Sequence, residues 1–228
     1  MRIALIIFFL AVLTVTAAVH SKLDGVFLEV YNHSAFYSTE RWHAELTAMK
    51  AVDVEFLIVQ SAASWFWPNY TASLSGRNTL NISEKWAGVH SFYPSKIGQG
   101  IEQIGDNIIG KIMGAAKKIG LKVYLGLAFI DIVYNNFTAD QELQLSLQVA
   151  DELWAMYGGS NSPLVGFYTV LEEGNQPYPL QPNATTYATM FLAPLAHKAK
   201  SLSTDLELLA SPWYRDTRRE PTYLTPAR

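Results

Sequence analysis

Five short runs of apolar, β-branched and aromatic residues recur along the chain, and segments with helical spacing separate them. The runs are Gly25–Tyr31, Glu55–Gln60, Lys122–Phe129, Leu164–Leu171 and Leu206–Trp213. Strands that alternate with helices in this way predict βα units and a parallel sheet. The runs are almost continuously apolar, which is typical of strands in a sheet whose two faces are both covered.

Four intervening segments carry apolar residues at the spacing of a helix. Their stripes are Trp42, Leu46 and Met49; Ile101, Ile104, Ile108, Ile112 and Ile119; Val149, Leu153 and Met156; and Tyr187, Phe191, Leu195 and Ala199. Ser38 and Thr138 can cap the first and third helices, and Gly120 can end the second. Pro194 is expected to strain the fourth, and Trp42 and Trp154 are expected in the core.

The order of these elements favours a barrel over a dinucleotide-binding fold. No glycine-rich phosphate loop follows the first strand, where a Rossmann fold carries it. A complete (β/α)8 barrel has eight strands and about 250 residues, whereas five strands are predicted here. The predicted fold class is therefore α/β, a partial (β/α)8 TIM barrel of about five βα units over residues 19–214. Residues 215–228 are expected to form a polar, disordered tail.

The first residues have the order of a secretory signal peptide. Met1 and Arg2 give a positive charge, an apolar run follows from Ile3 to Val15, and small residues come next. Cleavage after Ala17 and cleavage after Ala18 both fit. The run is shorter than the about 20 apolar residues that span a bilayer, and no later stretch is apolar enough. Residues 1–18 therefore predict a secreted, extracellular protein with no membrane contact after cleavage.

Glycosylation acceptor triplets support the same location. The five Asn-X-Ser/Thr sites are Asn32, Asn69, Asn81, Asn136 and Asn183. All five fall in segments that follow predicted strands, so glycans there are expected around the mouth of a barrel.

Charge and composition exclude several function classes. The formal net charge is -3 and no basic patch is present, which argues against nucleic acid as a partner. The chain has no cysteine, and its five histidines are scattered, so neither a disulfide framework nor a metal site is expected. No cofactor is predicted, and a hydrophobic core must supply the stability.

The segments LDGVFLEVYN, RWHAELTAMKAV, FYPSKIG, GLKVYLGLAF, VADELWAMYG and VGFYTVLEE carry a family resemblance through their order and spacing. Together, from about Leu23 to Tyr214, they resemble the glycoside-hydrolase-like TIM-barrel family filed as domain of unknown function 4434. The resemblance covers the first five strands of that barrel. It implies a fold related to retaining O-glycosidases and a carbohydrate as the partner.

The resemblance also implies a catalytic position. In related retaining barrels the acid/base carboxylate lies at the end of the fourth strand, and the nucleophile lies near the end of the seventh. Here the pattern GFY at Gly166–Tyr168 is followed by Glu172, which is predicted to be the proton donor, with Glu173 beside it. The alternative for Glu172 is a solvated loop glutamate. The seventh strand is absent from this sequence.

Other polar and aromatic residues follow strand ends and are candidates for sugar binding. They are Glu29, Gln60, Trp65, Trp67, Glu173, Trp213 and Tyr214. A carboxylate or amide at a strand end can bind sugar hydroxyls, and aromatic rings can stack on sugar faces. Alternatively, Glu29 is a structural acid paired with Arg41 or a backbone amide, and the rings, including the tryptophans of the long loop after the second strand, cover the barrel.

Three interpretations of the function stay open at this point. The first is a secreted glycoside-hydrolase-like barrel that acts on O-glycosidic bonds. The second is a non-catalytic carbohydrate-binding protein that keeps the barrel mouth. The third is a truncated, inactive gene product.

Overall fold

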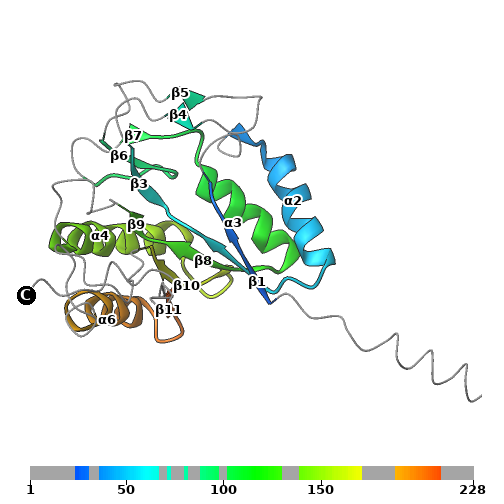
Figure 1. Ribbon diagram of the computed structural model, residues 1–228. Coiled ribbons are helices and arrows are strands. Elements are labelled where there is room, and N and C mark those ends of the chain that lie inside the picture. The colour runs from blue at the N-terminus through cyan, green and yellow to red at the C-terminus, as the bar shows by residue number, and fades with distance from the viewer. Residues whose placement is uncertain are drawn as a thin grey trace, which may run out of the picture.

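A five-stranded parallel sheet forms the centre of the fold. The computed structural model describes residues 24–30, 36–66, 71–72, 80–81, 88–97, 102–129, 139–170 and 188–211. The strands are β1 (Gly25–Leu28), β2 (Phe56–Val59), β8 (Lys122–Gly126), β10 (Leu164–Thr169) and β11 (Glu207–Ala210). They pair in this order, and every pair is parallel (Figure 1). The five predicted strands and the α/β partial-barrel fold class are confirmed.

The sheet is strongly curved, as the wall of a barrel must be. Phe27 of β1 and Tyr168 of β10 are separated by two intervening strands, yet their ring centroids lie 5.2 Å apart. Neighbouring strands are spaced by about 4.8 Å, so β1 and β10 lie about 14 Å apart along the sheet. The rings meet because the sheet curls around them. We call this concave side, which carries Phe27, Ile58, Tyr124 and Tyr168, the lumen face.

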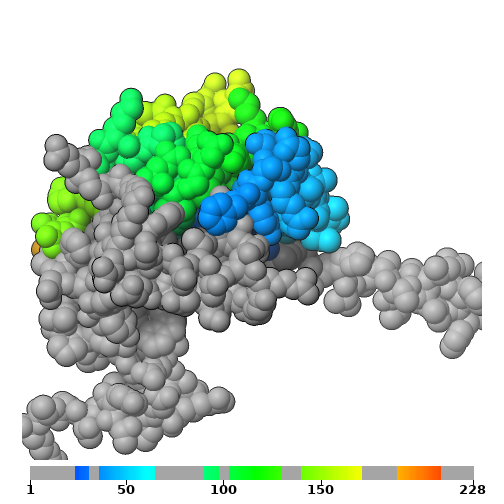
Figure 2. Space-filling model, turned by 90° about the horizontal axis from the view of Figure 1, so that it is seen from above, coloured from blue at the N-terminus to red at the C-terminus, as the bar shows by residue number. Residues whose placement is uncertain are grey.

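Helices cover the opposite side of the sheet. They are α2 (Thr39–Ala51), α3 (Ile108–Ile119), α4 (Ala139–Tyr157) and α6 (Ala193–Leu202). Helix α2 packs beside α3, shown in blue and green in the space-filling view (Figure 2), and α4 packs beside α6. Leu57, Val123 and Phe167 of the sheet are buried in one cluster with Trp42 of α2 and Ile112 of α3. This helix-side core is the main hydrophobic core of the described residues.

The first helix begins where the sequence predicts. The Ser38 side chain accepts a hydrogen bond of 3.2 Å from the backbone N–H of Arg41, and Glu40 lies in the first turn. This is the usual way to satisfy a free N–H at a helix start. Trp42 and Leu46 are buried, as predicted.

The second helix begins later than its isoleucine spacing predicts. The prediction of a helix from Ile101 is wrong, since α3 starts at Ile108 after Asn107 adopts a left-handed backbone with φ 44°. The Asn107 side chain caps the helix by accepting a 3.0 Å hydrogen bond from the N–H of Gly110. Ile104 is still buried, from the segment before the helix. Gly120 ends α3 with φ 68°, as predicted.

The last two helices each differ from the prediction, α4 in the burial of one residue and α6 in the turn that precedes it. Val149 and Leu153 of α4 are buried, but Met156 is 37% exposed, so its place in the core stripe is wrong. Before α6 a five-residue π-helix, η3 (Ala188–Leu192), precedes Pro194. Since η3 ends at Leu192 and α6 begins at Ala193, the two are continuous, and Pro194 cannot donate a backbone hydrogen bond to the turn before it.

A second, smaller sheet extends from the carboxyl ends of β2 and β8. It contains β7 (Glu102–Gln103), β6 (Gly88–Ser91), β3 (Ala63–Phe66) and β9 (Ala128–Phe129) in this order. Strand β3 pairs antiparallel with β6 and parallel with β9. The interpretation of this region as a long loop is therefore wrong for Trp65, whose backbone belongs to β3. A separate two-stranded ladder joins β4 (Thr71–Ala72) and β5 (Leu80–Asn81).

The segment after β6 is anchored to α4 by one carboxylate. Glu152 accepts hydrogen bonds from the Tyr93 hydroxyl at 3.0 Å, the Ser95 hydroxyl at 2.6 Å and the Lys96 N–H at 2.6 Å. Burial raises the pKa of Tyr93, so its hydroxyl stays protonated and keeps donating. The second sheet is thus tied to the helix layer.

None of the helices in the described part of the chain combines the length and the hydropathy needed to cross a bilayer.

Candidate functional site

Glu29 and Gln60 lie side by side at the carboxyl edge of the five-stranded sheet. Leu28 and Val30 pack in the helix-side core, so alternation along the strand places Glu29 on the lumen face, and it is exposed. Gln60 follows the same rule after Ile58, a lumen-face residue. The N–H of Gln60 donates a 2.9 Å hydrogen bond to the carbonyl of Leu28. A carboxylate and an amide therefore share one edge, as the sequence predicted for strands one and two.

An aromatic floor lies below this edge. Tyr168 is buried, whereas Phe27 remains 57% exposed, and the two rings meet edge to face. Phe56 and Tyr124 form a second edge-to-face pair, with centroids 5.6 Å apart. Rings of this kind give a ligand an apolar surface with a defined geometry.

A hydrogen bond between a tyrosine and a glutamate connects two strands on the lumen face. The Tyr124 hydroxyl donates to the carboxylate of Glu207 on β11, across the intervening strand β10. This crossing needs Gly166, since a Cβ there would lie 2.8 Å from the Tyr124 ring and 2.4 Å from the Glu207 carbonyl oxygen. Burial, followed by the hydrogen bond and charge of Glu207, raises the pKa of Tyr124 to about 12. The hydroxyl is therefore a permanent donor at neutral pH, and the pair braces the lumen face.

The second sheet adds a buried polar wall that the sequence interpretation missed. Ser64 of β3 lies opposite His90 of β6, and the hydroxyls of Ser61 and Ser64 are 2.7 Å apart. All three side chains are buried. Ser64 also pairs with Phe129, whose ring packs against the lumen-face cluster, so this wall adjoins the lumen. No sequence signal joins these residues, because the pairing of β3 with β6 spans a long insertion.

Several predicted site residues lie outside the described residues, and their roles stay predictions. These are Glu172, Glu173, Trp67, Trp213, Tyr214, Asn32, Asn69, Asn136 and Asn183, together with the side chains of Trp65 and Asn81. The core placement of Trp42 is confirmed, and Trp154 is partly buried against the same core. Within the described ranges no group of three His, Asp or Glu side chains is arranged to hold a metal ion.

The curved parallel sheet has counterparts among solved glycosidase structures. A protein proposed to be an alpha-L-fucosidase from Bacteroides thetaiotaomicron superposes with a TM-score of 0.60 and 19% identity, over 84% of this chain and 52% of that one. An intracellular xylanase from Thermoanaerobacterium saccharolyticum reaches a TM-score of 0.40 and 16% identity, over 81% and 51% of the two chains. The first superposition shows a shared α/β barrel fold, and this chain spans about half the length of both proteins.

The family follows from the sequence match. No curated protein matches this chain. The family described as Domain of unknown function (DUF4434) matches residues 23–225, which is most of the sequence. The chain is therefore a member of the DUF4434 family, with an α/β barrel fold.

Proposed function

We propose that this domain binds a saccharide at the carboxyl edge of its curved sheet. The observation that carries the proposal is the pair Glu29 and Gln60, placed together on the lumen face above the ring of Phe27. Ligand and active sites of parallel barrels lie at this end of the strands.

The chemistry of the edge matches that of a sugar. A carboxylate accepts hydrogen bonds from hydroxyls, and an amide both donates and accepts, so Glu29 and Gln60 can bind adjacent hydroxyl groups. The exposed part of Phe27 can cover the apolar C–H face of the ring. Glycosidase relatives of the fold support this ligand class.

Hydrolysis of an O-glycosidic bond is the catalytic form of the same proposal. It requires a carboxylic acid that protonates the leaving oxygen and a second carboxylate, about 5 Å away when configuration is retained. Glu172 follows the GFY segment of the fourth strand in the sequence and is our candidate for the acid. Glu29 is an exposed carboxylate at the carboxyl edge of the sheet.

We also propose that the protein is exported and glycosylated. The support is the charged, apolar and small-residue order of residues 1–18, together with the five acceptor triplets. A secreted setting is consistent with an extracellular glycan ligand.

A saccharide-binding assay tests the proposal directly. Ligand-observed NMR across mono- and oligosaccharides, fucosides and xylosides included, should detect binding to the wild-type protein. Gln60→Ala should weaken it about tenfold, the usual cost of losing a hydrogen bond in a binding site. Gln144→Ala is the matched control, because Gln144 is exposed on α4, away from the edge. Equal binding by Gln60→Ala and wild type would contradict this site.

Catalysis needs a separate measurement. Turnover of aryl glycosides that is abolished in Glu172→Gln would support the hydrolase form. Saccharide binding without turnover would leave the binding form and reject the hydrolase.

A further inference from the structure

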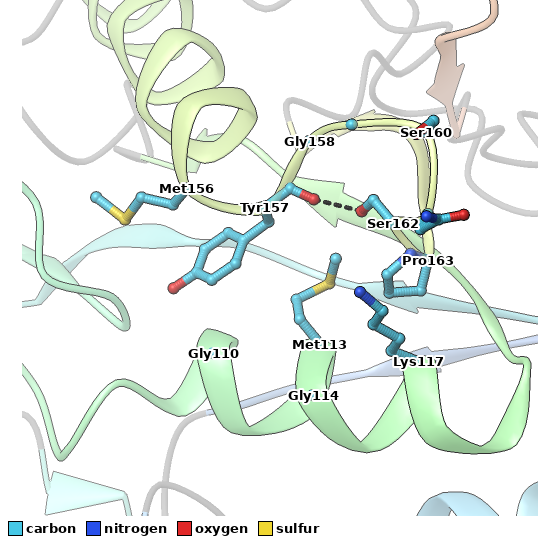
Figure 3. A pocket seen from close by; sticks show the side chains of 12 residues that line it. Gly110, Met113, Gly114, Lys117, Met156, Tyr157, Gly158, Ser160, Ser162 and Pro163 are labelled. Atoms are coloured by element: carbon cyan, nitrogen blue, oxygen red, sulfur yellow. Dashed lines mark hydrogen bonds between the residues drawn. The ribbon is translucent and has the colours of Figure 1, made fainter.

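A second concavity lies in the helix layer, on the other side of the sheet from the lumen face. It is bounded by α3 and by the 157–163 turn, which joins α4 to the amino end of β10 (Figure 3). Its volume is about 390 Å³, within the range of small-molecule sites. We call it the α3 pocket.

The floor of the α3 pocket is open at Gly114, where a Cβ would meet no atom within 4 Å. At Gly110, one helical turn earlier, the Asn107 side chain fills this space, and its Nδ2 would lie 2.4 Å from a Cβ. Met113 points from the helix toward the turn, and Met156 lines the other wall (Figure 3). Methionine side chains adapt to ligands of irregular shape. The floor and walls therefore offer an apolar surface beside free space.

The frame of the α3 pocket is fixed by hydrogen bonds within the protein. The Tyr157 hydroxyl donates to Oδ1 of Asn107 at 2.7 Å, and burial raises the pKa of this tyrosine, which stays neutral. The Ser162 hydroxyl donates to the carbonyl of Tyr157 and accepts from the N–H of Leu164 at 2.9 Å. These groups position the turn, so the pocket exists without a ligand.

The remaining polar groups of the pocket favour an anion. Lys117 extends from α3 toward the turn, and no carboxylate lines the pocket (Figure 3). Within the described residues, none of Lys117, Lys118 and Lys122 forms an ion pair. Ser160 and Asn161 add a hydroxyl and an amide at the rim. A positive charge with hydrogen-bonding neighbours binds a carboxylate well.

We propose that the α3 pocket binds a small hydroxylated organic acid. Its carboxylate pairs with the ammonium group of Lys117, and its hydroxyls bind Ser160 and Asn161. The carbon skeleton of the acid lies against Met113 and against the backbone of Gly114, which has no side chain. The inference rests on the pocket alone and is independent of the saccharide proposed at the carboxyl edge.

Gluconate, an open-chain hydroxylated acid, is the probe, with sorbitol as its neutral counterpart of similar size; neither is a ring sugar of the kind proposed for the carboxyl edge. Isothermal titration calorimetry on the full chain should show that gluconate binds and that sorbitol binds at least about tenfold more weakly. Lys117→Gln, which removes the charge, should weaken gluconate binding about tenfold. Gly114→Leu, which fills the open space, should abolish it. Lys118→Gln is the matched control, since Lys118 does not line the pocket, and should bind as the wild type does.

Thermal melting of each variant confirms that it is folded, and Gly114 is exposed, so its replacement leaves the core intact. The proposal is overturned if gluconate fails to bind the wild type, or if sorbitol binds equally well. It is also overturned if Lys117→Gln and Gly114→Leu bind like Lys118→Gln. A saccharide that binds at the carboxyl edge should not displace gluconate, and displacement would overturn a separate pocket.

Discussion

A single methyl group at position 126 should disturb the carboxyl edge of the sheet. A Cβ on Gly126 would lie 1.9 Å from the carbonyl oxygen of Gln60 and 2.6 Å from that of Val59. Both are backbone atoms, so the Gln60 segment must move by more than 1 Å, and the 2.8 Å hydrogen bond from the Ala62 N–H to the Gly126 carbonyl is put at risk. Overpacking of this kind costs up to about 3 kcal/mol.

Gly114→Ala is the matched control, with an effect of opposite sign. Gly114 is exposed in the middle of α3 and has free space around it, so alanine should stabilise the helix by about 0.8–1 kcal/mol. For a domain of this size each kcal/mol shifts Tm by about 2–4 °C. We therefore expect Gly126→Ala to melt below the wild type by up to about 6–12 °C, and Gly114→Ala about 2–4 °C above it.

Differential scanning calorimetry measures both shifts under identical conditions. Saccharide binding should also fall in Gly126→Ala, because Gln60 is displaced. A Gly126→Ala protein that melts with the wild type would refute the close approach of the two backbone segments. A fall in Tm for Gly114→Ala would instead show that its helix face is occupied.

Further predictions concern pH, a buried carboxylate contact and processing. The raised pKa of Tyr124 stabilises the fold below about pH 10, and this stabilisation is lost as the pH rises through about 12. Between pH 8 and pH 11.5, urea unfolding should show a loss of stability to which Tyr124 contributes about 1–2 kcal/mol, because solvent screens part of its full shift. Tyr124→Phe should lack this component, whereas the components of Tyr93 and Tyr157 should remain. Glu152→Ala should cost about 1–3 kcal/mol in the same assay, since the buried Tyr93 hydroxyl loses its acceptor; an unchanged urea midpoint would contradict this contact. Protein secreted from eukaryotic cells should begin within three residues of Val19 by N-terminal sequencing and should lose several kilodaltons on deglycosylation, and retention of the apolar run would exclude a cleaved signal.

The five main strands were predictable because a strand that is buried on both faces is apolar along its whole length. Leu57 and Val59 pack on the helix-side core while Ile58 packs on the lumen face, so the whole run is apolar. The same logic places Glu29 and Gln60 at the strand ends, since a polar residue there ends the apolar run.

The second sheet was not predictable on the same grounds. Ser64 and His90 are buried but polar and interrupt the apolar residues of β3 and β6, so neither composition nor periodicity marks these strands. The start of α3 was missed because the left-handed backbone of Asn107 interrupts a regular isoleucine spacing. Met156 fits the helical period of α4 but lies beside the open α3 pocket, which leaves it exposed.

The order of strand pairing has a consequence for synthesis on the ribosome. Each parallel pair in the main sheet joins a strand to the one made immediately before it in that sheet, so no strand waits for a distant partner. Once β8 has emerged, β1, β2, α2 and α3 can already bury Trp42 against Ile112. Proteins are made at about 5–20 residues per second, which leaves seconds for each unit to dock before the next appears. The sheet can therefore form strand by strand in the order of synthesis, beginning with β1. The strand made most recently is always the edge strand to which the next one pairs.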